Sequence, residues 1–495
     1  MPATRTLCNF VNNQAAPVTG NETLDVTAPH TGQIIAHVPL SSSDDVDVAV
    51  AAAAKAWPAW AALTVNARSA KMMALHGLLT AHTAELVDLI VSEHGKTRAE
   101  AMGDVGKGLE TLAYAAGAGA VGAGHATYVS GGVLCRMDRA PLGVVASIVP
   151  FNFPFMVPFW TLPLALAMGN TCVLKPSEKV PLTMTRVAEL AASVLPPGVL
   201  NLVHGSGAVA QALIDHPGVA AVTFVGSSPV AESVHARATA GGKRVLALGG
   251  AKNHLVALPD CDLEMTARDI VASFTGCAGQ RCMAASVLLV VGEQPALIAR
   301  VVELASALVP GSDGPLAMGP VIDATAVARI EAAVRNAAAE SGADILLDGH
   351  APTTQFAVRQ AEKGGFWVGP SVIRHHSPDD RALHEEIFGP VLSVLHCADA
   401  HEALAIENAS AFGNAACVYT ASGAAAEFFA QRFAAAMIGV NVGVPVPREP
   451  FSFGGCKRSR FGSSDITGDA AIEFFSTRRK ITTKWSVPTD QSWMS

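Results

Sequence analysis

The stretch "GVVASIVPFNFP", residues 143–154, joins an unbroken apolar run to a loop rich in proline and phenylalanine. Further apolar runs follow this one along the chain. Segments of about 20 residues, each long enough for one amphipathic helix, separate successive runs. The later runs are "TCVLK" (171–175), "VLNLV" (199–203), "AVTFV" (221–225) and "RVLAL" (244–248). Apolar strands that alternate with helices predict a buried parallel sheet in a doubly wound α/β domain.

A second alternation of strands and helices begins after "LGGAKNH" (248–254) and defines a second α/β unit over 252–440. Its predicted strands are "NHLVALP", "ASVLLVVG", "VLSVLH" and "AACVYTA", and its predicted helices lie near 262–276, 294–308, 322–340 and 399–409. Residues 43–120 have apolar residues at three- and four-residue spacing, which predicts helices before the first sheet.

Two segments belong to neither unit. "ATYVSGGVLCRMDR" (126–139) is typical of a hairpin, and "AAIEFFSTRRKITTKW" (470–485) alternates like a strand. Strands without a home sheet often pair across subunits, so we expect a homo-oligomer, a dimer or a tetramer. The predicted organisation is a first domain of 1–125 and 140–251, a second of 252–440, and oligomerisation strands at 126–139 and 465–490.

Composition narrows the class of protein. A chain of 495 residues exceeds one compact core, and 50% hydrophobic against 15% charged residues supplies a large interior. The net charge of −8, with no long basic run, argues against nucleic acid and anionic membrane as partners. Nine scattered cysteines suit a reducing compartment, and the N-terminus lacks a secretory pattern, so we expect a cytoplasmic protein.

Residues 141–174 contain no charged side chain and so resemble a membrane span. Four prolines, at 150, 154, 158 and 163, would break a lipid-exposed helix repeatedly. A buried strand, loop and helix is therefore the preferred interpretation.

The segment "CAGQRCMA" (277–284) holds two cysteines with four possible roles: metal ligands, a regulatory disulfide, apolar packing or a reactive thiolate. No further Cys or His lies nearby, so a metal site is not expected. Arg281 and Gln280 make the surroundings of Cys282 polar and positive, which favours a thiolate there.

Polar residues at predicted strand ends supply further candidates. Asn152 could donate to an oxyanion or cap the following helix. "FVGSSPVAES" (224–233) forms a strand, a turn and a helix N-terminus, a possible phosphate cradle, and Lys175 is either a ribose or phosphate donor or a solvated lysine. In "HEEIFGPVL" (384–392) the rigid "FGP" would fix one carboxylate for a ribose diol.

Seven motifs together resemble the aldehyde dehydrogenase superfamily: "PFNFP", "KPSE", "FVGS", "LGGAKNH", "GQRCMA", "EEIFGP" and "FSFGG". Within it, "GAKNH", "GQRCM", "NVGVPVP" and "KITTKW" are similar to the branch that oxidises methylmalonate semialdehyde and acylates CoA. The resemblance implies an aldehyde-dehydrogenase-like fold with a Rossmann-type NAD-binding domain, an α/β catalytic domain and a small β oligomerisation element.

The resemblance also implies roles for individual residues. Cys282 matches the nucleophile, and Asn152 with the backbone N–H of Cys282 matches the oxyanion hole. Positions that hold NAD in the family correspond to Phe151, Lys175, Glu178, Lys179, Ser227, Gly249 and Glu386.

Two positions depart from the family pattern. The general base that activates water in hydrolytic members is replaced by Ala247 or Leu248, depending on the gap, which favours release of the acyl group to CoA. Arg281 matches an arginine that meets the substrate carboxylate, but the second such arginine is replaced by Lys107. Lys107 could also be a surface helix lysine near Asp104 and Glu110.

The sequence therefore predicts NAD-dependent oxidation of methylmalonate or malonate semialdehyde through a thioester on Cys282. CoA, as co-substrate, would take the acyl group as propionyl-CoA or acetyl-CoA with loss of CO2. The alternatives are a hydrolytic aldehyde dehydrogenase that forms a free acid from another aldehyde, and a non-catalytic binding or structural oligomer.

Overall fold

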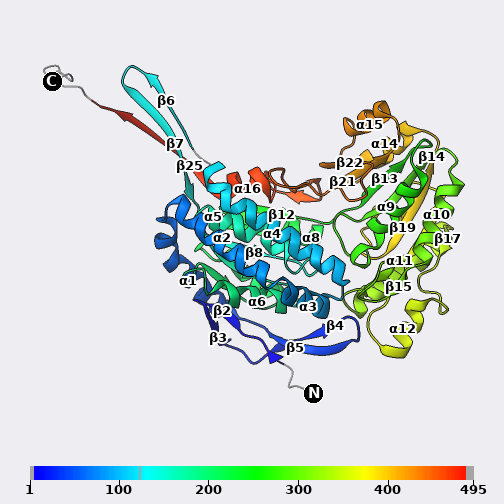
Figure 1. Cartoon of the computed structure of the whole chain (residues 1–495), viewed down its shortest axis with the longest axis horizontal. Coiled ribbons are helices and arrows are strands. Elements are labelled where there is room, and N and C mark those ends of the chain that lie inside the picture. Colours follow the sequence, from blue (N-terminus) through cyan, green and yellow to red (C-terminus); the bar gives the residue numbers. More distant parts are fainter. Residues whose placement is uncertain (1–4, 122–123, 486–495) are drawn as a thin grey trace.

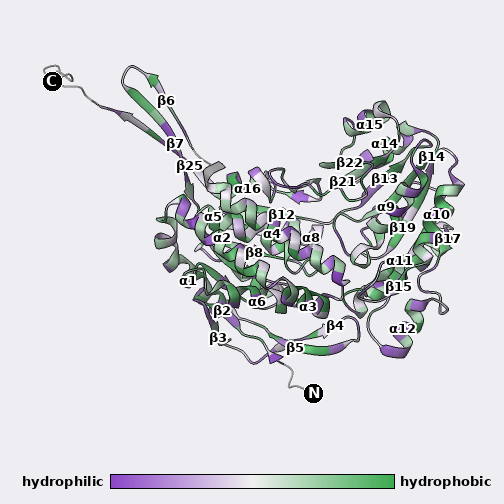
Figure 2. Cartoon of the chain, viewed as in Figure 1, coloured by the Kyte–Doolittle hydropathy of each residue, from purple (hydrophilic) through white to green (hydrophobic). Residues whose placement is uncertain are grey.

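Two α/β bodies and a projecting arm make up the protein in the computed structural model, which describes residues 5–121 and 124–485 (Figure 1). The first body contains most of the chain before residue 250, and the second contains most of the chain after that residue. Apolar residues are concentrated in the sheets and helices of both bodies (Figure 2).

The first body is built on an eight-stranded sheet in the order β24-β12-β11-β8-β9-β10-β2-β3. Its five central strands pair in parallel. They are β8 (Val144–Ile148), β9 (Thr171–Lys175), β10 (Leu200–Leu202), β11 (Val219–Val225) and β12 (Arg244–Leu248). All five coincide with the predicted runs, so the predicted parallel sheet is confirmed. The helices between and before these strands are α1 (Ser43–Ala61), α5 (Met156–Ala167), α6 (Leu182–Ala191), α7 (Gly207–Asp215) and α8 (Ser228–Ala240).

Short strands extend this sheet beyond the prediction. They are β2 (Asn9–Val11) and β3 (Gln14–Ala16) at one edge and β24 (Arg460–Phe461) at the other. A separate three-stranded sheet contains β1 (Arg5–Thr6), β4 (Thr23–Ala28) and β5 (Gln33–Pro39). Strands of two or three residues carry too little alternation to be recognised in a sequence.

The predicted helical region of the first body forms α1, α2 (Val65–Ala81), α3 (Thr83–His94) and α4 (Arg98–Val121). All twelve residues of α5 are buried, so the charge-free segment is a buried strand, loop and helix as predicted. Within the described residues no single helix has the length and apolarity to cross a bilayer; α2 and α3, bent by 67°, pass that test only as a pair.

The second body contains a seven-stranded sheet in the order β17-β18-β19-β14-β13-β21-β22. Its strands are β13 (Asn253–Ala257), β14 (Ala285–Val291), β17 (Asp344–Leu347), β18 (Ser371–His375), β19 (Val391–Cys397), β21 (Ala415–Tyr419) and β22 (Met437–Val440). Its helices are α9 (Leu263–Thr275), α10 (Pro295–Ser306), α11 (Ala324–Ser341), α12 (Gln355–Lys363), α13 (Arg381–His384), α14 (Ala400–Ala409) and α15 (Gly423–Ala430). Every predicted strand and helix of this unit is found. Minor two-residue strands are β15 (Val309–Pro310), β16 (Ala317–Met318), β20 (Phe412–Gly413) and β23 (Cys456–Lys457).

The arm is a three-stranded sheet of β6 (His125–Ser130), β7 (Val133–Pro141) and β25 (Ser476–Lys484), with β7 in the centre (Figure 1). The predicted hairpin is confirmed. The strand predicted over 470–485 is wrong in its first part, because α16 (Gly468–Phe474) is a helix that buries Ile472 and Phe474 in the core beside α5. Residues 486–490 of the predicted oligomerisation strand lie outside the described residues.

Candidate active site

The loop that carries Cys282 connects α9 to β14 and has a fixed, left-handed backbone. Cys277, Ala278 and Gly279 have φ angles of 51°, 52° and 72° in succession. A Cβ atom on Gly279 would lie 2.1 Å from the carbonyl oxygen of Gly389, so only glycine fits. The carboxylate of Glu100 accepts the N–H of Cys277 at 2.5 Å and stabilises the turn.

Two buried amides hold the backbone at Cys282 itself. The Nδ2 groups of Asn253 and Asn414 donate to the carbonyl oxygen of Cys282 at 2.7 and 2.8 Å. Asn253 stands in the quoted "GAKNH" motif, whereas Asn414 has no signal in the sequence beyond its place before a strand. Both positioning residues were absent from the predicted site.

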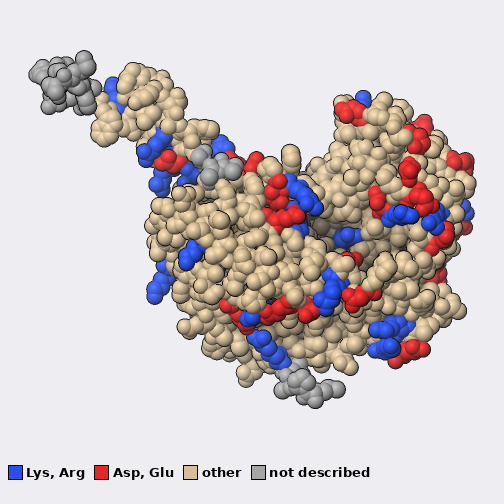
Figure 3. Space-filling model, viewed as in Figure 1, with Lys and Arg blue, Asp and Glu red and all other residues tan. Residues whose placement is uncertain are grey.

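Cys282 lines a cavity of about 520 Å³ between the two bodies. Figure 3 shows the hollow between them, with acidic and basic side chains close together along its edge. The lining is mainly apolar and includes three cations, Lys107, Arg281 and Arg448. The other lining residues are Gly103, Phe153, Met156, Trp160, Cys282, Met283, Val444, Val446 and Phe453. Cys282 is partly exposed, whereas Cys277 is 3% exposed and packs in the interior. Both thiols are free, so the cysteine that can meet a ligand is Cys282.

Asn152 lies against the Cys282 loop. Its Nδ2 donates to the carbonyl oxygen of Gln280 at 3.0 Å, and its side chain is almost fully buried. The N-cap of α5 is Phe155, so the alternative role of Asn152 as that cap is excluded. The same amide carries a second N–H.

A buried ion pair fixes the Asn152 loop from behind. The ammonium of Lys96 donates to the backbone oxygen of Asn152 and to the Asp104 carboxylate, both at 2.9 Å. The other oxygen of Asp104 accepts the N–H of Met156 at 2.6 Å. Burial alone would lower the pKa of Lys96, but the charge and hydrogen bond of Asp104, together with Cys277 and Glu100, outweigh it and raise that pKa.

The predicted influence of Arg281 on the Cys282 thiol has the expected direction but is small. Burial, reinforced by the Glu386 carboxylate, raises the pKa of Cys282 to about 12, and Arg281 opposes this only weakly. The Arg281 guanidinium donates to the carbonyl oxygens of Ala272 and Ser273 at the end of α9. Gln280 is fully buried, and its side chain bonds only backbone groups.

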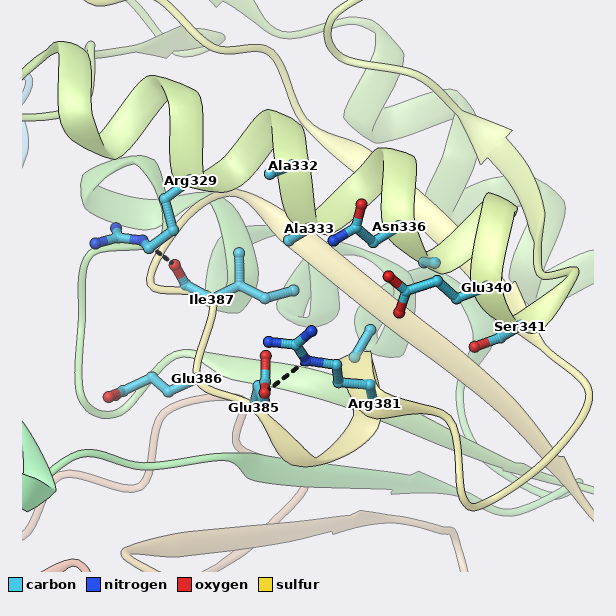
Figure 4. Close-up of a pocket in the computed structure, with 12 residues that line it drawn as sticks. Arg329, Ala332, Ala333, Asn336, Glu340, Ser341, Arg381, Glu385, Glu386 and Ile387 are labelled. Carbon is cyan, nitrogen blue, oxygen red and sulfur yellow. Dashed lines mark hydrogen bonds and ion pairs between the residues drawn. The ribbon is translucent and has the colours of Figure 1, made fainter.

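The two adjacent glutamates of "HEEIFGP" have different partners (Figure 4). Glu385 pairs with Arg381 at 2.6 Å beside a surface pocket of about 210 Å³. The side chain of Glu386 points away from that pair and accepts the N–H of Ala251 at 2.9 Å. A Cβ atom on Gly250 would lie 2.1 Å from the Glu386 carboxylate, so this carboxylate meets the glycine turn after β12. Burial raises its pKa.

The predicted NAD residues of the first body follow neighbouring strands of its parallel sheet. Phe151 follows β8, Lys175 ends β9, Ser227 follows β11 and Gly249 follows β12, and the strand ends lie in register. The carboxyl ends of parallel strands meet at one edge, which is where open α/β sheets bind ligands. The structure therefore brings these residues to the same edge.

Polar groups at this edge are partly available to a ligand. Ser227 is exposed at the N-terminus of α8 and makes no capping hydrogen bond, whereas the neighbouring Ser228 is buried and bonds the protein backbone. Lys175 is buried beside Glu178 at 3.3 Å, and burial lowers its pKa. Lys179 pairs with Asp323 at 2.5 Å and lies over the ring of Phe151.

Gly249 is required by the packing of the chain itself. A Cβ atom there would lie 2.5 Å from the carbonyl oxygen of Arg458 and 2.6 Å from the hydroxyl of Ser228. The preceding residues, Ala247 and Leu248, are both buried in β12. Neither side chain can accept a proton, whichever of the two occupies the position of the family's general base.

Lys107 lies on the cavity wall, but a carboxylate already meets its ammonium. Glu449, which the sequence did not single out, pairs with it at 2.7 Å, and Glu110 lies at 3.4 Å. The helix pair predicted between Lys107 and Glu110 is present, but as the longer of the two contacts of Lys107. Asp104 does not pair with Lys107, because it pairs with Lys96. Lys107 is half-buried, in contact with two carboxylates rather than with solvent alone.

Comparison with known proteins identifies the family of the chain. The aldehyde dehydrogenase family model matches residues 17–481. A malonate-semialdehyde dehydrogenase of Geobacillus kaustophilus is 41% identical over 98% of this chain and 99% of its own length, and one of Bacillus mycoides is 40% identical over 98% and 100%.

Solved structures agree as well. A Sinorhizobium meliloti protein assigned as a methylmalonate-semialdehyde dehydrogenase, complexed with NAD, is 36% identical with a TM-score of 0.95, covering 99% of this chain and 100% of its own. A methylmalonate-semialdehyde dehydrogenase of Oceanimonas doudoroffii is 36% identical with a TM-score of 0.94, covering 98% and 99%. The chain therefore has the aldehyde dehydrogenase fold and belongs to the aldehyde dehydrogenase family.

Proposed function

We propose that the protein oxidises malonate or methylmalonate semialdehyde with NAD and passes the acyl group to CoA. The observation that carries this proposal is the pairing of an accessible thiol, Cys282, with a sheet end that lacks a general base at Ala247 and Leu248. The names of the relatives described above support the same substrate class.

The residues at the sheet edge fit a dinucleotide. The uncapped N-terminus of α8 offers backbone N–H groups to phosphate, with Ser227 exposed there. Lys175, Glu178, Lys179, Phe151, Gly249 and Glu386 complete the proposed NAD site, with Glu386 meeting the edge from the second body. NAD, when bound, accepts the hydride from the substrate carbon.

The chemistry begins at Cys282. Its thiol first releases the S–H proton to solvent. The thiolate sulfur then attacks the aldehyde carbon, and the electron pair of the C=O π bond moves onto the oxygen as negative charge. We assign stabilisation of that oxygen to the second N–H of Asn152 and to the backbone N–H of Cys282. Loss of the hydride re-forms the carbonyl group and leaves the acyl group on Cys282 as a thioester.

Release of the acyl group completes the reaction. The carboxylate β to the thioester carbonyl leaves as CO2, and the carbon that carried it takes a proton. A CoA thiolate then attacks the thioester carbon and returns Cys282 as the leaving thiolate. Because a thiolate needs no proton acceptor, this step suits a site without a base at Ala247 and Leu248.

A hydrolytic reaction is the second candidate, favoured by one observation. The Glu386 carboxylate contributes to the raised pKa of the Cys282 thiol, and in this reaction we assign to it the role of proton acceptor for water. The product would then be a free acid. Mass analysis of the products from malonate semialdehyde and NAD, with and without CoA, decides between the two reactions. Acetyl-CoA formation supports acyl transfer, whereas equal turnover to free acid without CoA contradicts it.

We also propose that the arm joins subunits into a dimer or tetramer. Tyr128, Val129 and Trp485 are exposed on it, at 74%, 57% and 80%. Such apolar exposure along unpaired strand edges is typical of an interface.

The nine free cysteines support the predicted reducing, cytoplasmic location. The division into domains 1–125 with 140–251, 252–440, and the arm segments 126–139 and 465–490 stays a proposal.

A further inference from the structure

One wall of the Cys282 cavity carries a cluster of charges that compensate one another. The ammonium of Lys107 donates to Glu449 at 2.7 Å, and the hydroxyl of Thr111 donates to the other oxygen of Glu449 at 2.8 Å. Glu110 lies 3.4 Å from Lys107 and 3.2 Å from Arg448. Two cations therefore face two anions, and this wall contributes no net charge.

The central pair of this cluster is largely shielded from water. The side chains of Lys107 and Glu449 are 15% and 7% exposed, and Thr111 is buried. Charges interact more strongly there than at an open surface, because little water screens them. A substrate carboxylate that approached Lys107 would also approach Glu449 and be repelled by it.

Arg281 is the cavity cation outside this cluster. Its guanidinium donates to the carbonyl oxygens of Ala272 and Ser273. Within the described residues no carboxylate forms an ion pair with it, so its full charge is offset only by peptide dipoles. The cavity thus presents one uncompensated cation beside Cys282.

We propose that Glu449 determines the charge selectivity of the aldehyde site. The Glu449 carboxylate pairs with the ammonium of Lys107, so Arg281 is the cation that remains to bind the carboxylate of a semialdehyde. The apolar remainder of the lining, which includes Trp160 and Phe453, then accepts uncharged aldehydes to an extent that Glu449 sets. This inference rests on the proposed oxidation of a carboxylated aldehyde.

The test compares two aldehydes of matched shape, malonate semialdehyde and 3-methylbutanal, in which an isopropyl group replaces the carboxylate. The measured quantity is the ratio of their kcat/KM values, from NADH formation in the presence of CoA. Glu449→Gln keeps an acceptor for Thr111 but removes the negative charge. We expect this variant to raise the ratio in favour of the semialdehyde by about tenfold or more, chiefly through KM.

A double variant separates compensation from direct binding. Lys107→Met with Glu449→Gln replaces a neutral pair of charges with a neutral pair of side chains. We expect its ratio to stay within about threefold of the unmodified protein, because Lys107 contributes no free charge. A large fall in the ratio of the double variant would show that Lys107 holds the substrate carboxylate directly. No rise in the ratio of Glu449→Gln would show that Glu449 does not mask Lys107. Either result would overturn the proposal.

A binding measurement keeps the test independent of turnover. 3-Hydroxypropanoate, the unreactive alcohol that corresponds to malonate semialdehyde, is titrated by calorimetry into the unmodified protein and into Glu449→Gln. We expect Glu449→Gln to bind it about tenfold more tightly, and equal affinity contradicts the proposal. If the product is a free acid rather than acetyl-CoA, the proposed acyl transfer fails, but both measurements on Glu449 still stand.

Discussion

The ammonium of Lys96 donates to the backbone oxygen of Asn152 at 2.9 Å while it forms a fully buried ion pair with Asp104. The oxyanion donor proposed for the reaction is therefore held by α4 and the turn before it. An ion pair at this depth costs desolvation energy, so its value to the protein lies in position rather than in stability.

Replacement of Lys96 by methionine tests this role. The buried Asp104 carboxylate would lose its partner, and we expect unfolding free energy to fall by about 3–5 kcal/mol with a loss of kcat. In the double variant Lys96→Met with Asp104→Asn, which keeps an acceptor for the N–H of Met156, part of the stability should return while kcat stays low. Urea unfolding and steady-state kinetics measure the two effects, and recovery of kcat in the double variant would falsify a positioning role.

The two cysteines of the "CAGQRCMA" segment should differ completely in function. Cys282→Ala is expected to abolish NADH formation, because the attacking sulfur is lost. Cys277→Ala removes a buried thiol outside the cavity, and its turnover should remain within a few-fold of the unmodified protein. Mass spectrometry after denaturation of enzyme with substrate and NAD should find the acyl group on Cys282 and none on Cys277.

The raised pKa of Cys282, about 12, predicts a slow and steeply pH-dependent thiol. A group with this pKa is protonated at neutral pH, so alkylation by iodoacetamide should accelerate about tenfold per pH unit between pH 7 and 10. Removal of the Glu386 charge in Glu386→Gln lowers the pKa and should speed alkylation at pH 8. The rate is followed by mass spectrometry on the peptide that carries Cys282, because the exposed Cys8 also reacts. A plateau near pH 8 would contradict the raised pKa.

Asn414 is expected to affect the rate of reaction more than substrate affinity. Its amide holds the carbonyl oxygen of Cys282 at 2.8 Å, so Asn414→Ala should lower kcat by about tenfold with a small change in KM. Asn408 is the matched control, because its amide donates to the backbone oxygen of Arg432 on the surface. Equal losses in the two variants would point to a general effect on folding.

The arm offers a direct test of assembly. A charge at Val129, which is 57% exposed, should disfavour burial against another subunit. Light scattering after size-exclusion chromatography should then give a smaller mass for Val129→Glu than for the unmodified protein. An unchanged mass would place the interface elsewhere.

Much of the fold was readable from the sequence because its strands are buried on both faces. Uninterrupted apolar runs of this length, such as "AVTFV" and "ASVLLVV", are typical of central strands in a parallel sheet, and β11 and β14 coincide with them closely. The same pattern also located the sheet edge, since strand ends in parallel sheets converge. Recognition of the motif order added Cys282 and Asn152, which periodicity alone would not distinguish from packing residues.

Contacts between distant segments were not readable in this way. Glu449 meets Lys107 across 342 positions of the chain, and no local pattern announces that pair. The direction of the Arg281 side chain depended on the carbonyl groups at the end of α9, which are brought together only once that helix has formed. Residues 470–474 alternate like a strand, but burial against α5 made them part of a helix.

The pairing of β25 with β7 sets an order of events during synthesis. Ser476–Lys484 bonds to Val133–Pro141, so the central strand of the arm leaves the ribosome long before one of its two neighbours exists. Both bodies can begin to fold while this edge is still open. The third strand of the arm therefore becomes available only after the strands of both bodies have been synthesised.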